Sequence, residues 1–246
     1  MLVPKREDTI HKAWLYRILT EIADNAFLSS HLYFKGDTCA AMAGYLNRFS
    51  IDLDFDLMSN HQEKIIMATK ELEKIIIKLG LTIKDKSQRG FQYFLKYESA
   101  ANKRNTIKVE ALFPAPKSNI YEPVYFSEID RTLKCQTKET MFANKLVAII
   151  DRYEKQKSLA GRDLYDIHQF FLQGFKYNKD VIKERRNIDT KKYFLELIIF
   201  IKKHFNNTII NQDLNTLLLT VEFQRIRKIL LSEVLMFLKD EVIRLK

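Results

Sequence analysis

Residues 51–57 alternate strictly between large apolar and acidic side chains, and this alternation constrains the fold more than any other stretch. Successive side chains of a β-strand point to opposite faces, so a period of two predicts a strand with one apolar and one acidic face. The apolar face carries Ile51, Leu53, Phe55 and Leu57, and the acidic face carries Asp52, Asp54 and Asp56. Because the apolar side chains are large and β-favouring, we expect a central strand, buried on its apolar side.

Stacked acids on one strand face repel each other unless the face is hydrated or a divalent cation lies against it. A solvated edge strand is therefore one interpretation. The stretches 91–97 and 106–113 also alternate and predict an antiparallel hairpin whose second strand carries Glu110. Two carboxylates two residues apart, with a third from a neighbouring strand, offer the oxygen ligands by which Mg²⁺ bridges triphosphate oxygens and activates an attacking hydroxyl.

Helical spacing dominates the rest of the chain and predicts an α+β fold. Helices are expected over 8–28, 40–46, 62–79, 139–153, 163–171 and repeatedly from 190 to the end, with a short strand over 31–35 that meets a turn at Gly36. The composition changes after Pro114 and Pro116. We therefore predict a mixed β-sheet with helices in an N-terminal domain, 1–135, followed by an all-α C-terminal domain, 136–246.

Composition excludes several classes of protein. With 46% hydrophobic residues, 6 Gly and 4 Pro in 246 residues, the chain is neither mainly disordered nor rich enough in turns for an all-β sandwich. Two cysteines are too few for a disulfide framework, and no apolar run approaches the ~20 residues of a membrane span, so we expect a cytoplasmic protein with reduced thiols and no membrane partner. The net charge of +10 permits nucleic-acid binding but is also found in Lys-rich proteins without that function.

Two segments resemble motifs of the AbiEii/AbiGii toxin family of bacterial nucleotidyltransferases, within the polymerase-β-like superfamily. The first is Phe34-Lys35-Gly36-Asp37-Thr38, a helical segment, and then Arg48-Phe49-Ser50-Ile51-Asp52-Leu53-Asp54-Phe55. The second is Asn144-Lys145-Leu146-Val147-Ala148 followed by Gly161-Arg162-Asp163-Leu164-Tyr165-Asp166-Ile167. Together the resemblance covers about residues 31–172 and implies a nucleotidyltransferase-type fold.

The resemblance implies a nucleotide site around the first motif. Gly36 would let the backbone approach the phosphates, and Thr38 with the amides of the following helix N-terminus would cradle them. Asp37 stands where the family usually has Gly or Ser, so its side chain either turns away, caps the helix or weakens nucleotide binding. Arg48 and Ser50 would support the acidic strand or contact the nucleotide. Arg48 is otherwise interpreted as a surface counter-charge to the acids.

The acids themselves are assigned by the same resemblance. Asp52 and Asp54 would bind Mg²⁺. Glu110 stands where the superfamily more often has Asp, and would complete the metal site and assist deprotonation of the acceptor hydroxyl. Asp56 shares the acidic face but lies beyond the motif, and we interpret it as a solvated residue at the end of the strand.

The second motif places a lysine and two acids on helices. A lysine on a largely apolar helix usually extends to solvent, whereas the resemblance makes Lys145 a triphosphate ligand that stabilises the leaving group. Asp163 is either favoured by the helix dipole or part of the nucleotide site. Asp166 is either a structural partner of Arg162 or Lys145, or the functional acid that we favour by resemblance.

Basic clusters follow in the helical half, and each is either a solvated helix face or a set of phosphate contacts. They are Lys183 with Arg185 and Arg186, Lys191 with Lys192, Lys202 with Lys203, and Arg225 with Arg227 and Lys228. Tyr177 and Tyr193 are interpreted equally as core residues or as stacking platforms.

The resemblance implies an Mg²⁺-dependent enzyme that transfers a nucleotide from an NTP to tRNA or another RNA and releases pyrophosphate. It would be the toxin of a bacterial toxin–antitoxin system, a monomer with a cognate antitoxin as partner. Two alternatives stay open. One is nucleotidyl transfer to a protein or small molecule, and the other is a catalytically silent module that binds nucleic acid or a protein partner.

Overall fold

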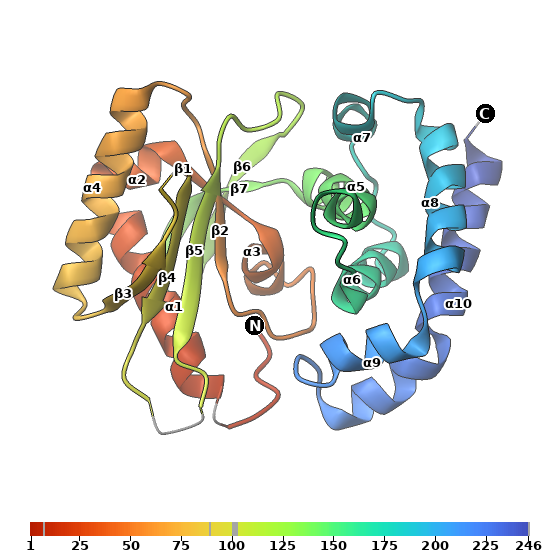
Figure 1. Cartoon of the computed structure of the whole chain (residues 1–246), viewed down its shortest axis with the longest axis horizontal. Coiled ribbons are helices and arrows are strands. Elements are labelled where there is room, and N and C mark those ends of the chain that lie inside the picture. The colour runs from red at the N-terminus through yellow and green to blue at the C-terminus, as the bar shows by residue number, and fades with distance from the viewer. Residues whose placement is uncertain (7, 89, 100–102, 246) are drawn as a thin grey trace. The chain divides into compact units, whose positions relative to one another are not determined.

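The computed structural model describes residues 1–6, 8–88, 90–99 and 103–245 (Figure 1). The chain divides into two compact units. The first comprises residues 1–115 and 120–137, and the second comprises residues 116–119 and 138–246. The first unit contains the β-sheet, and the second is helical, so the predicted α+β class and its order along the chain are confirmed.

A mixed sheet forms the centre of the first unit, and its described strands lie in the order β3-β4-β5-β2-β1-β7-β6. These strands are β1 (Leu32–Lys35), β2 (Leu53–Leu57), β3 (Thr82–Lys86), β4 (Phe91–Lys96), β5 (Thr106–Leu112), β6 (Tyr121–Phe126) and β7 (Arg131–Gln136). The acidic strand β2 is central, as predicted, and pairs in parallel with β5 and antiparallel with β1. The predicted hairpin is confirmed as the antiparallel pair β4–β5.

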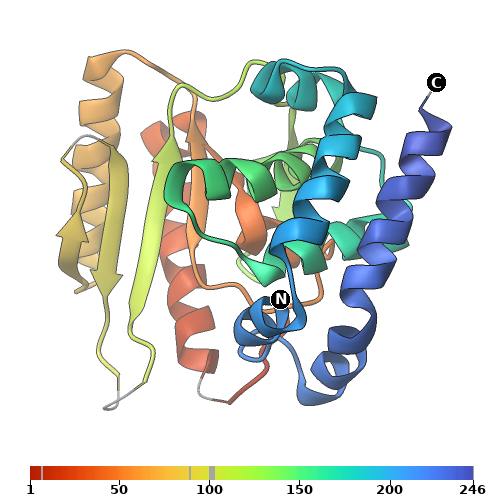
Figure 2. The same ribbon diagram turned by 45° about the vertical axis from the view of Figure 1, so that its right-hand side comes forward.

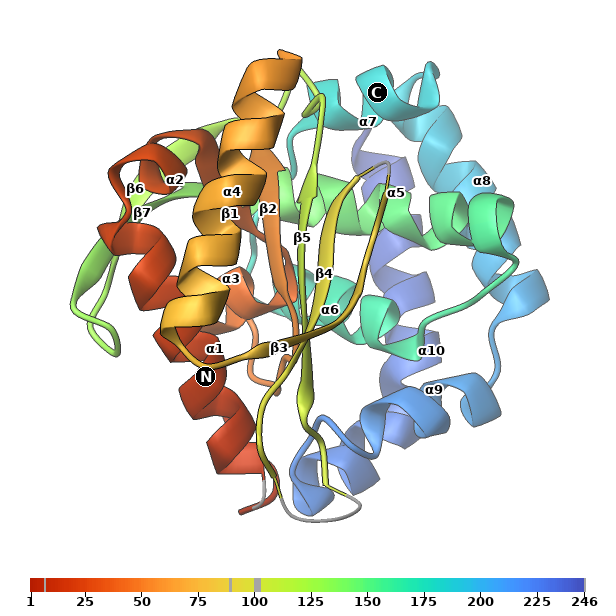
Figure 3. The same ribbon diagram turned by 60° about the vertical axis from the view of Figure 1, so that its left-hand side comes forward.

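Helices cover the apolar side of β2, where Leu53, Phe55 and Leu57 are fully buried. The helices of this unit are α1 (Asp8–Asp24), α2 (Ala26–His31), α3 (Gly36–Met42) and α4 (Gln62–Lys78). Figure 3 shows α1, α2 and α4 together on one side of the sheet, while α3 follows β1 directly and contacts β1 and β2. The helix predicted over 8–28 is two helices, because the side chain of Asn25 accepts hydrogen bonds from backbone amides of the next turn and starts α2.

Three strands, β3, β6 and β7, were not predicted from the sequence. All five residues of β3 are exposed at one edge of the sheet, so no apolar–polar alternation marks the strand. Strand β6 forms the other edge and contains Pro123, a residue tolerated at sheet edges but not typical of strands. Its partner β7 lies in the stretch that the sequence analysis treated as the boundary between the two halves.

The second unit is built from helices, in agreement with the prediction. They are α5 (Lys138–Gln156), α6 (Gly161–Leu172), α7 (Lys179–Arg186), α8 (Thr190–His204), α9 (Asn207–Leu214) and α10 (Thr220–Arg244). Figure 2 shows α8 beside the long α10, and the two helices are in contact. Helix α6 starts at a glycine because a Cβ on Gly161 would lie 2.6 Å from the Cα of Ile210 in α9. Within the described residues, no helix combines the length and apolar character needed to cross a membrane.

Candidate active site

The central acids come together through strand register. Strands β2 and β5 pair in parallel with Asp54 opposite Glu110, so the two carboxylates lie at the same level of the sheet. Burial raises the pKa of Asp54 to about 8; Lys108 opposes this shift, and the charge of Glu110 adds to it. Burial also pushes the pKa of Glu110 upward, but hydrogen bonds from Lys108, Asp54 and Gln92 outweigh burial and lower it.

Lys108 is the residue of this cluster that the sequence analysis missed. Its Nζ donates to Oε1 of Glu110 at 2.7 Å and lies 4.0 Å from Oδ1 of Asp54. Burial disfavours the charged lysine, but the nearby charges of Asp54, Glu110 and Asp52 raise its pKa. Lys108 has the same parity as Glu110 on β5, and this parity was the sequence signal that could have identified it.

The turn between β1 and α3 is packed against Asp54. Gly36 has φ +75°, and a Cβ at this position would lie 2.5 Å from Oδ2 of Asp54. Only glycine adopts this conformation without strain and leaves room for the carboxylate. The role predicted for Gly36, a close approach of the backbone to phosphates, stays a prediction.

Asp52 is attached to the same turn through its backbone. The hydroxyl of Thr38 donates to the carbonyl of Asp52 at 2.5 Å and is hydrogen-bonded to Oγ of Ser50 at 2.7 Å. Thr38 and Ser50 are both buried. The side chain of Thr38 therefore fixes the acidic segment to α3, and the predicted contact of Thr38 with phosphates stays a prediction. Ser50 supports the acidic segment, which was one of its two predicted roles.

Asp37 turns toward Arg48. Nη2 of Arg48 lies 2.5 Å from Oδ2 of Asp37, and a second nitrogen donates to the carbonyl of Phe49 at 3.0 Å. The N-cap position of α3 belongs to Lys35, so the interpretation of Asp37 as the cap is wrong. Arg48 is 1% exposed, so the interpretation as a surface counter-charge is also wrong: it is a buried partner of Asp37.

The prediction that Asp56 is solvated is wrong, because its side chain is fully buried. It accepts hydrogen bonds from Nζ of Lys35 at 2.6 Å, the hydroxyl of Tyr121 at 2.7 Å and Nε2 of Gln136 at 2.6 Å. These donors lie on β1, β6 and β7, whose pairing brings them around the end of β2. Asp56 therefore joins four strands and is not a hydrated strand end.

In the second unit, Lys145 lies between two buried acids. Its Nζ is 2.7 Å from Oδ2 of Asp166 and 3.1 Å from Oδ1 of Asp163, and Nε of Arg152 is 3.2 Å from Oδ2 of Asp163. The interpretation that Lys145 extends to solvent is therefore wrong. Asp166 does pair with Lys145, which was the alternative to its favoured functional role, and that functional role stays a prediction. Asp163 lies in the first turn of α6, where the helix dipole favours a negative charge.

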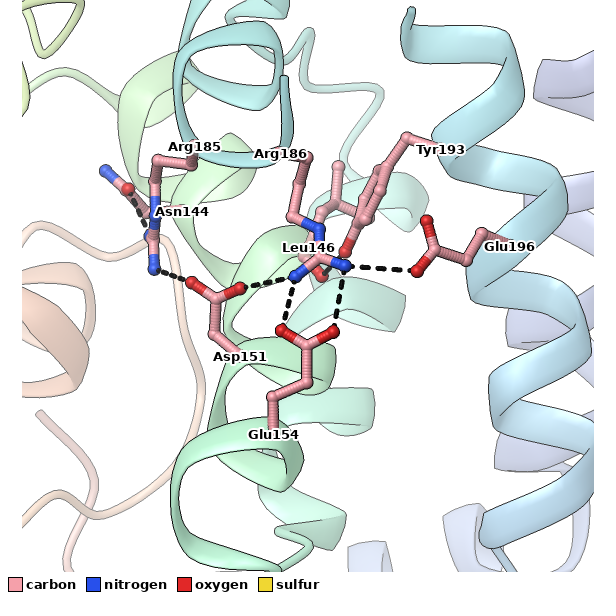
Figure 4. Close-up of polar contacts among 8 residues, drawn as sticks. All are labelled: Asn144, Leu146, Asp151, Glu154, Arg185, Arg186, Tyr193 and Glu196. Carbon is pink, nitrogen blue, oxygen red and sulfur yellow. Dashed lines mark hydrogen bonds and ion pairs between the residues drawn. The ribbon is translucent and has the colours of Figure 1, made fainter. Parts of the chain in front are cut away.

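Arg185 and Arg186 take part in an ion-pair network within this unit (Figure 4). Arg185 contacts Asp151 at 2.6 Å and Asn144 at 2.7 Å. Arg186 contacts Asp151, Glu154 and Glu196 at 2.8–3.0 Å, which links α7 to α5 and α8. These contacts favour a structural role for both arginines over phosphate binding. Tyr193, whose hydroxyl donates to the carbonyl of Leu146 at 2.7 Å, is a core residue.

The donor set suits a hard cation that is bound together with a substrate. Across the part of the chain that the structure describes, no group of three His, Cys, Asp or Glu side chains is arranged to hold a metal ion. Mg²⁺, however, is usually bound by one or two carboxylates plus substrate phosphate oxygens. Asp52 and Asp54, two residues apart and fixed to the Gly36 turn, supply such carboxylates.

The fold is shared with solved structures of nucleotidyltransferases. Its structure is similar to JHP933 from Helicobacter pylori, at 21% identity and a TM-score of 0.55 over 96% of this chain and 94% of that one. It is also similar to MenT4, a nucleotidyltransferase toxin from Mycobacterium tuberculosis H37Rv, at 16% identity and a TM-score of 0.56 over 96% and 86%. A candidate nucleotidyltransferase from H. pylori has 21% identity and a TM-score of 0.60 over 98% and 99%.

Residues 17–232 match the family described as "Nucleotidyl transferase AbiEii toxin, Type IV TA system", and the chain belongs to this family. It is thus a nucleotidyltransferase and the toxin of a toxin–antitoxin system. The comparison with curated proteins finds no match. Family membership favours the enzyme over the alternative of a catalytically silent module.

Proposed function

We propose that this toxin transfers a nucleotide from an NTP to an RNA acceptor, with tRNA as the first candidate, in a reaction that depends on Mg²⁺. The observation that carries the proposal is the packing of Asp54 and of the Asp52 backbone against the β1–α3 turn, because it holds the carboxylate of Asp54 beside backbone suited to phosphates. In this reaction a hydroxyl of the acceptor forms a bond to the α-phosphorus, and the bond to pyrophosphate breaks.

Asp52 and Asp54 would hold the metal ion, which when bound neutralises charge on the triphosphate oxygens. Lys145 would stabilise the negative charge of the leaving pyrophosphate. Asp163 and Asp166 hold its ammonium in place through their ion pairs. Deprotonation of the acceptor by Glu110, one of the two roles predicted for it from sequence, is disfavoured by the hydrogen bonds that lower the pKa of this carboxylate.

The choice of RNA rests on charge and on the family resemblance. The chain carries 41 Lys and Arg against 31 Asp and Glu, and this surplus favours a polyanionic acceptor. We also propose that the toxin acts in the cytoplasm as a monomer and that a cognate antitoxin binds it. Both cysteines are buried free thiols, as expected for a reducing compartment.

The decisive experiment incubates the full chain with Mg²⁺, total tRNA and each of the four NTPs labelled at the α-phosphate. We expect label on RNA from one or two of the NTPs, and less than ~1% of that signal with Asp54→Asn, since loss of a metal ligand costs at least ~10²-fold. Asp85→Asn, which changes an exposed acid on edge strand β3, is the control and should retain activity. Label on protein alone would establish the alternative acceptor, and no label on any acceptor would contradict the proposal.

A further inference from the structure

We propose that Lys108 is the resident cation of the acid cluster formed by Asp52, Asp54 and Glu110, and that the site consequently takes one divalent ion rather than two. The inference deepens the proposed function and rests on it in one respect, the binding of the ion by Asp52 and Asp54. Glu110 is then a positioning residue that holds the ammonium of Lys108 and is not a metal ligand.

The hydrogen bonds of Glu110 are the first reason to infer that it is not a metal ligand. Its Oε1 accepts from Nζ of Lys108 at 2.7 Å, and its Oε2 accepts from Nε2 of Gln92 at 2.8 Å. Gln92 lies directly opposite Glu110 in the antiparallel pair β4–β5, so strand register fixes this contact. Both carboxylate oxygens therefore already accept from a donor, and a metal ion at Glu110 would be repelled by the ammonium of Lys108.

The position of Lys108 beside the acids is the second reason, because its charge opposes the binding of a second ion. Its Nζ lies 4.0 Å from Oδ1 of Asp54 and 2.7 Å from Oε1 of Glu110, so a positive charge already lies beside both acids and would repel a second ion there. The side chain is one-quarter exposed, which limits its screening by water. Asp52 also acts electrostatically on Lys108, so all three acids contribute to the field that holds the ammonium.

The charge of the ammonium has a measurable consequence for metal binding. A positive charge close to Asp54 repels a divalent ion at the neighbouring position, so removing the charge should tighten that ion and open a second position. The metal stoichiometry of the intact protein reports this directly. It does not require nucleotide transfer, so a failure of the proposed RNA reaction would leave the result interpretable.

The test counts bound Mn²⁺ per chain by electron paramagnetic resonance, in the presence of a non-hydrolysable NTP analogue. We expect one ion for the wild type, one for Lys108→Arg, and two for Lys108→Met, with the first bound roughly tenfold more tightly. Lys96→Met, which changes an exposed lysine on the adjacent strand β4, is the matched control and should bind as the wild type does. Two ions or none in the wild type, or an unchanged count and affinity in Lys108→Met, would overturn the proposal.

Glu110→Gln gives a second test that survives if Lys108→Met fails to fold. A glutamine can still accept from Lys108 through its carbonyl oxygen but is a much weaker metal ligand. If Glu110 holds Lys108 and is not a ligand, this variant keeps one Mn²⁺, bound up to about tenfold more weakly because a negative charge near the ion is lost. Loss of the ion in Glu110→Gln would show that Glu110 is a ligand and would contradict the inference.

Discussion

Asp54 is packed so closely against Gly36 that residue 36 has no room for a side chain: a Cβ there would lie 2.5 Å from Oδ2 of the aspartate, well inside van der Waals contact. The turn that starts α3 and the acid at the centre of the sheet are therefore mutually dependent. Gly36 also has φ +75°, so two separate requirements exclude a side chain at this position. Of these, only the steric requirement bears on the position of Asp54.

Gly36→Ala should abolish nucleotidyl transfer, because the methyl group must displace the carboxylate of Asp54. Gly44→Ala is the matched control, since Gly44 has φ +79° and its Cβ would meet nothing within 4 Å. Both variants should lose about 1 kcal/mol of stability from the left-handed backbone, but only Gly36→Ala should lose Mn²⁺ binding and transfer. Full Mn²⁺ binding by Gly36→Ala would show that the carboxylate can move without consequence.

Asp56→Asn should destabilise the first unit by about 3 kcal/mol, because it breaks a buried ion pair with Lys35. The denaturant midpoint followed by circular dichroism measures the loss, with Asp85→Asn on the exposed edge strand β3 as the control. A midpoint like that of the wild type would mean that the asparagine satisfies Lys35, Tyr121 and Gln136 as well as the carboxylate does.

Local patterns allowed much of this fold to be predicted, and partners distant in sequence account for what was missed. The acidic strand and the β4–β5 hairpin follow from alternation alone, which is a property of consecutive residues. The buried state of Asp56 could not be predicted in this way, because its donors come from three other strands and two of those strands have weak patterns.

In the candidate site, too, local pattern predicted some features, and partners distant in sequence determine the others. The alternation predicted Asp52 and Asp54 on one strand, and the structure confirms this for Asp54, which lies in β2 beside the Gly36 turn, whereas Asp52 immediately precedes the strand. It did not indicate that Arg48 is buried against Asp37, because an arginine is interpreted as exposed until its partner is known. Lys108 could not be assigned to the site although its parity matches that of Glu110, because its contact with the acids depends on the pairing of β2 with β5.

His11 should make stability depend on pH below neutrality. Burial lowers its pKa to about 4 from 6.5, although the backbone acceptor Ile51 raises it. Below pH 6.5 the unfolded chain therefore binds a proton at His11 more readily than the folded chain does. The free energy of unfolding falls as the pH drops from 6.5 to 4, by up to about 3 kcal/mol.

Urea unfolding at pH 7 and pH 4.5 measures this effect as the difference between the wild type and His11→Gln. His61→Gln, at an exposed position, corrects for other groups that titrate in the same range. The wild type should lose more stability on acidification than His11→Gln does. If it instead loses less, the imidazolium is stabilised between Ile51 and the hydroxyl of Tyr97, and folding raises the pKa of His11 rather than lowering it.

Lys145 can be tested for a catalytic role separately from its structural one. Lys145→Met leaves Asp166 buried without its ion-pair partner at 2.7 Å, so the single variant should lose both stability and transfer. In Lys145→Met combined with Asp166→Asn the uncompensated charge is gone, and most of the stability should return. If Lys145 stabilises the leaving pyrophosphate, the double variant remains at least ~10²-fold slower in transfer than the wild type. Asp166→Asn alone, which keeps the ammonium, is the matched control for the loss of the acid, and a double variant as active as Asp166→Asn would restrict Lys145 to a structural role.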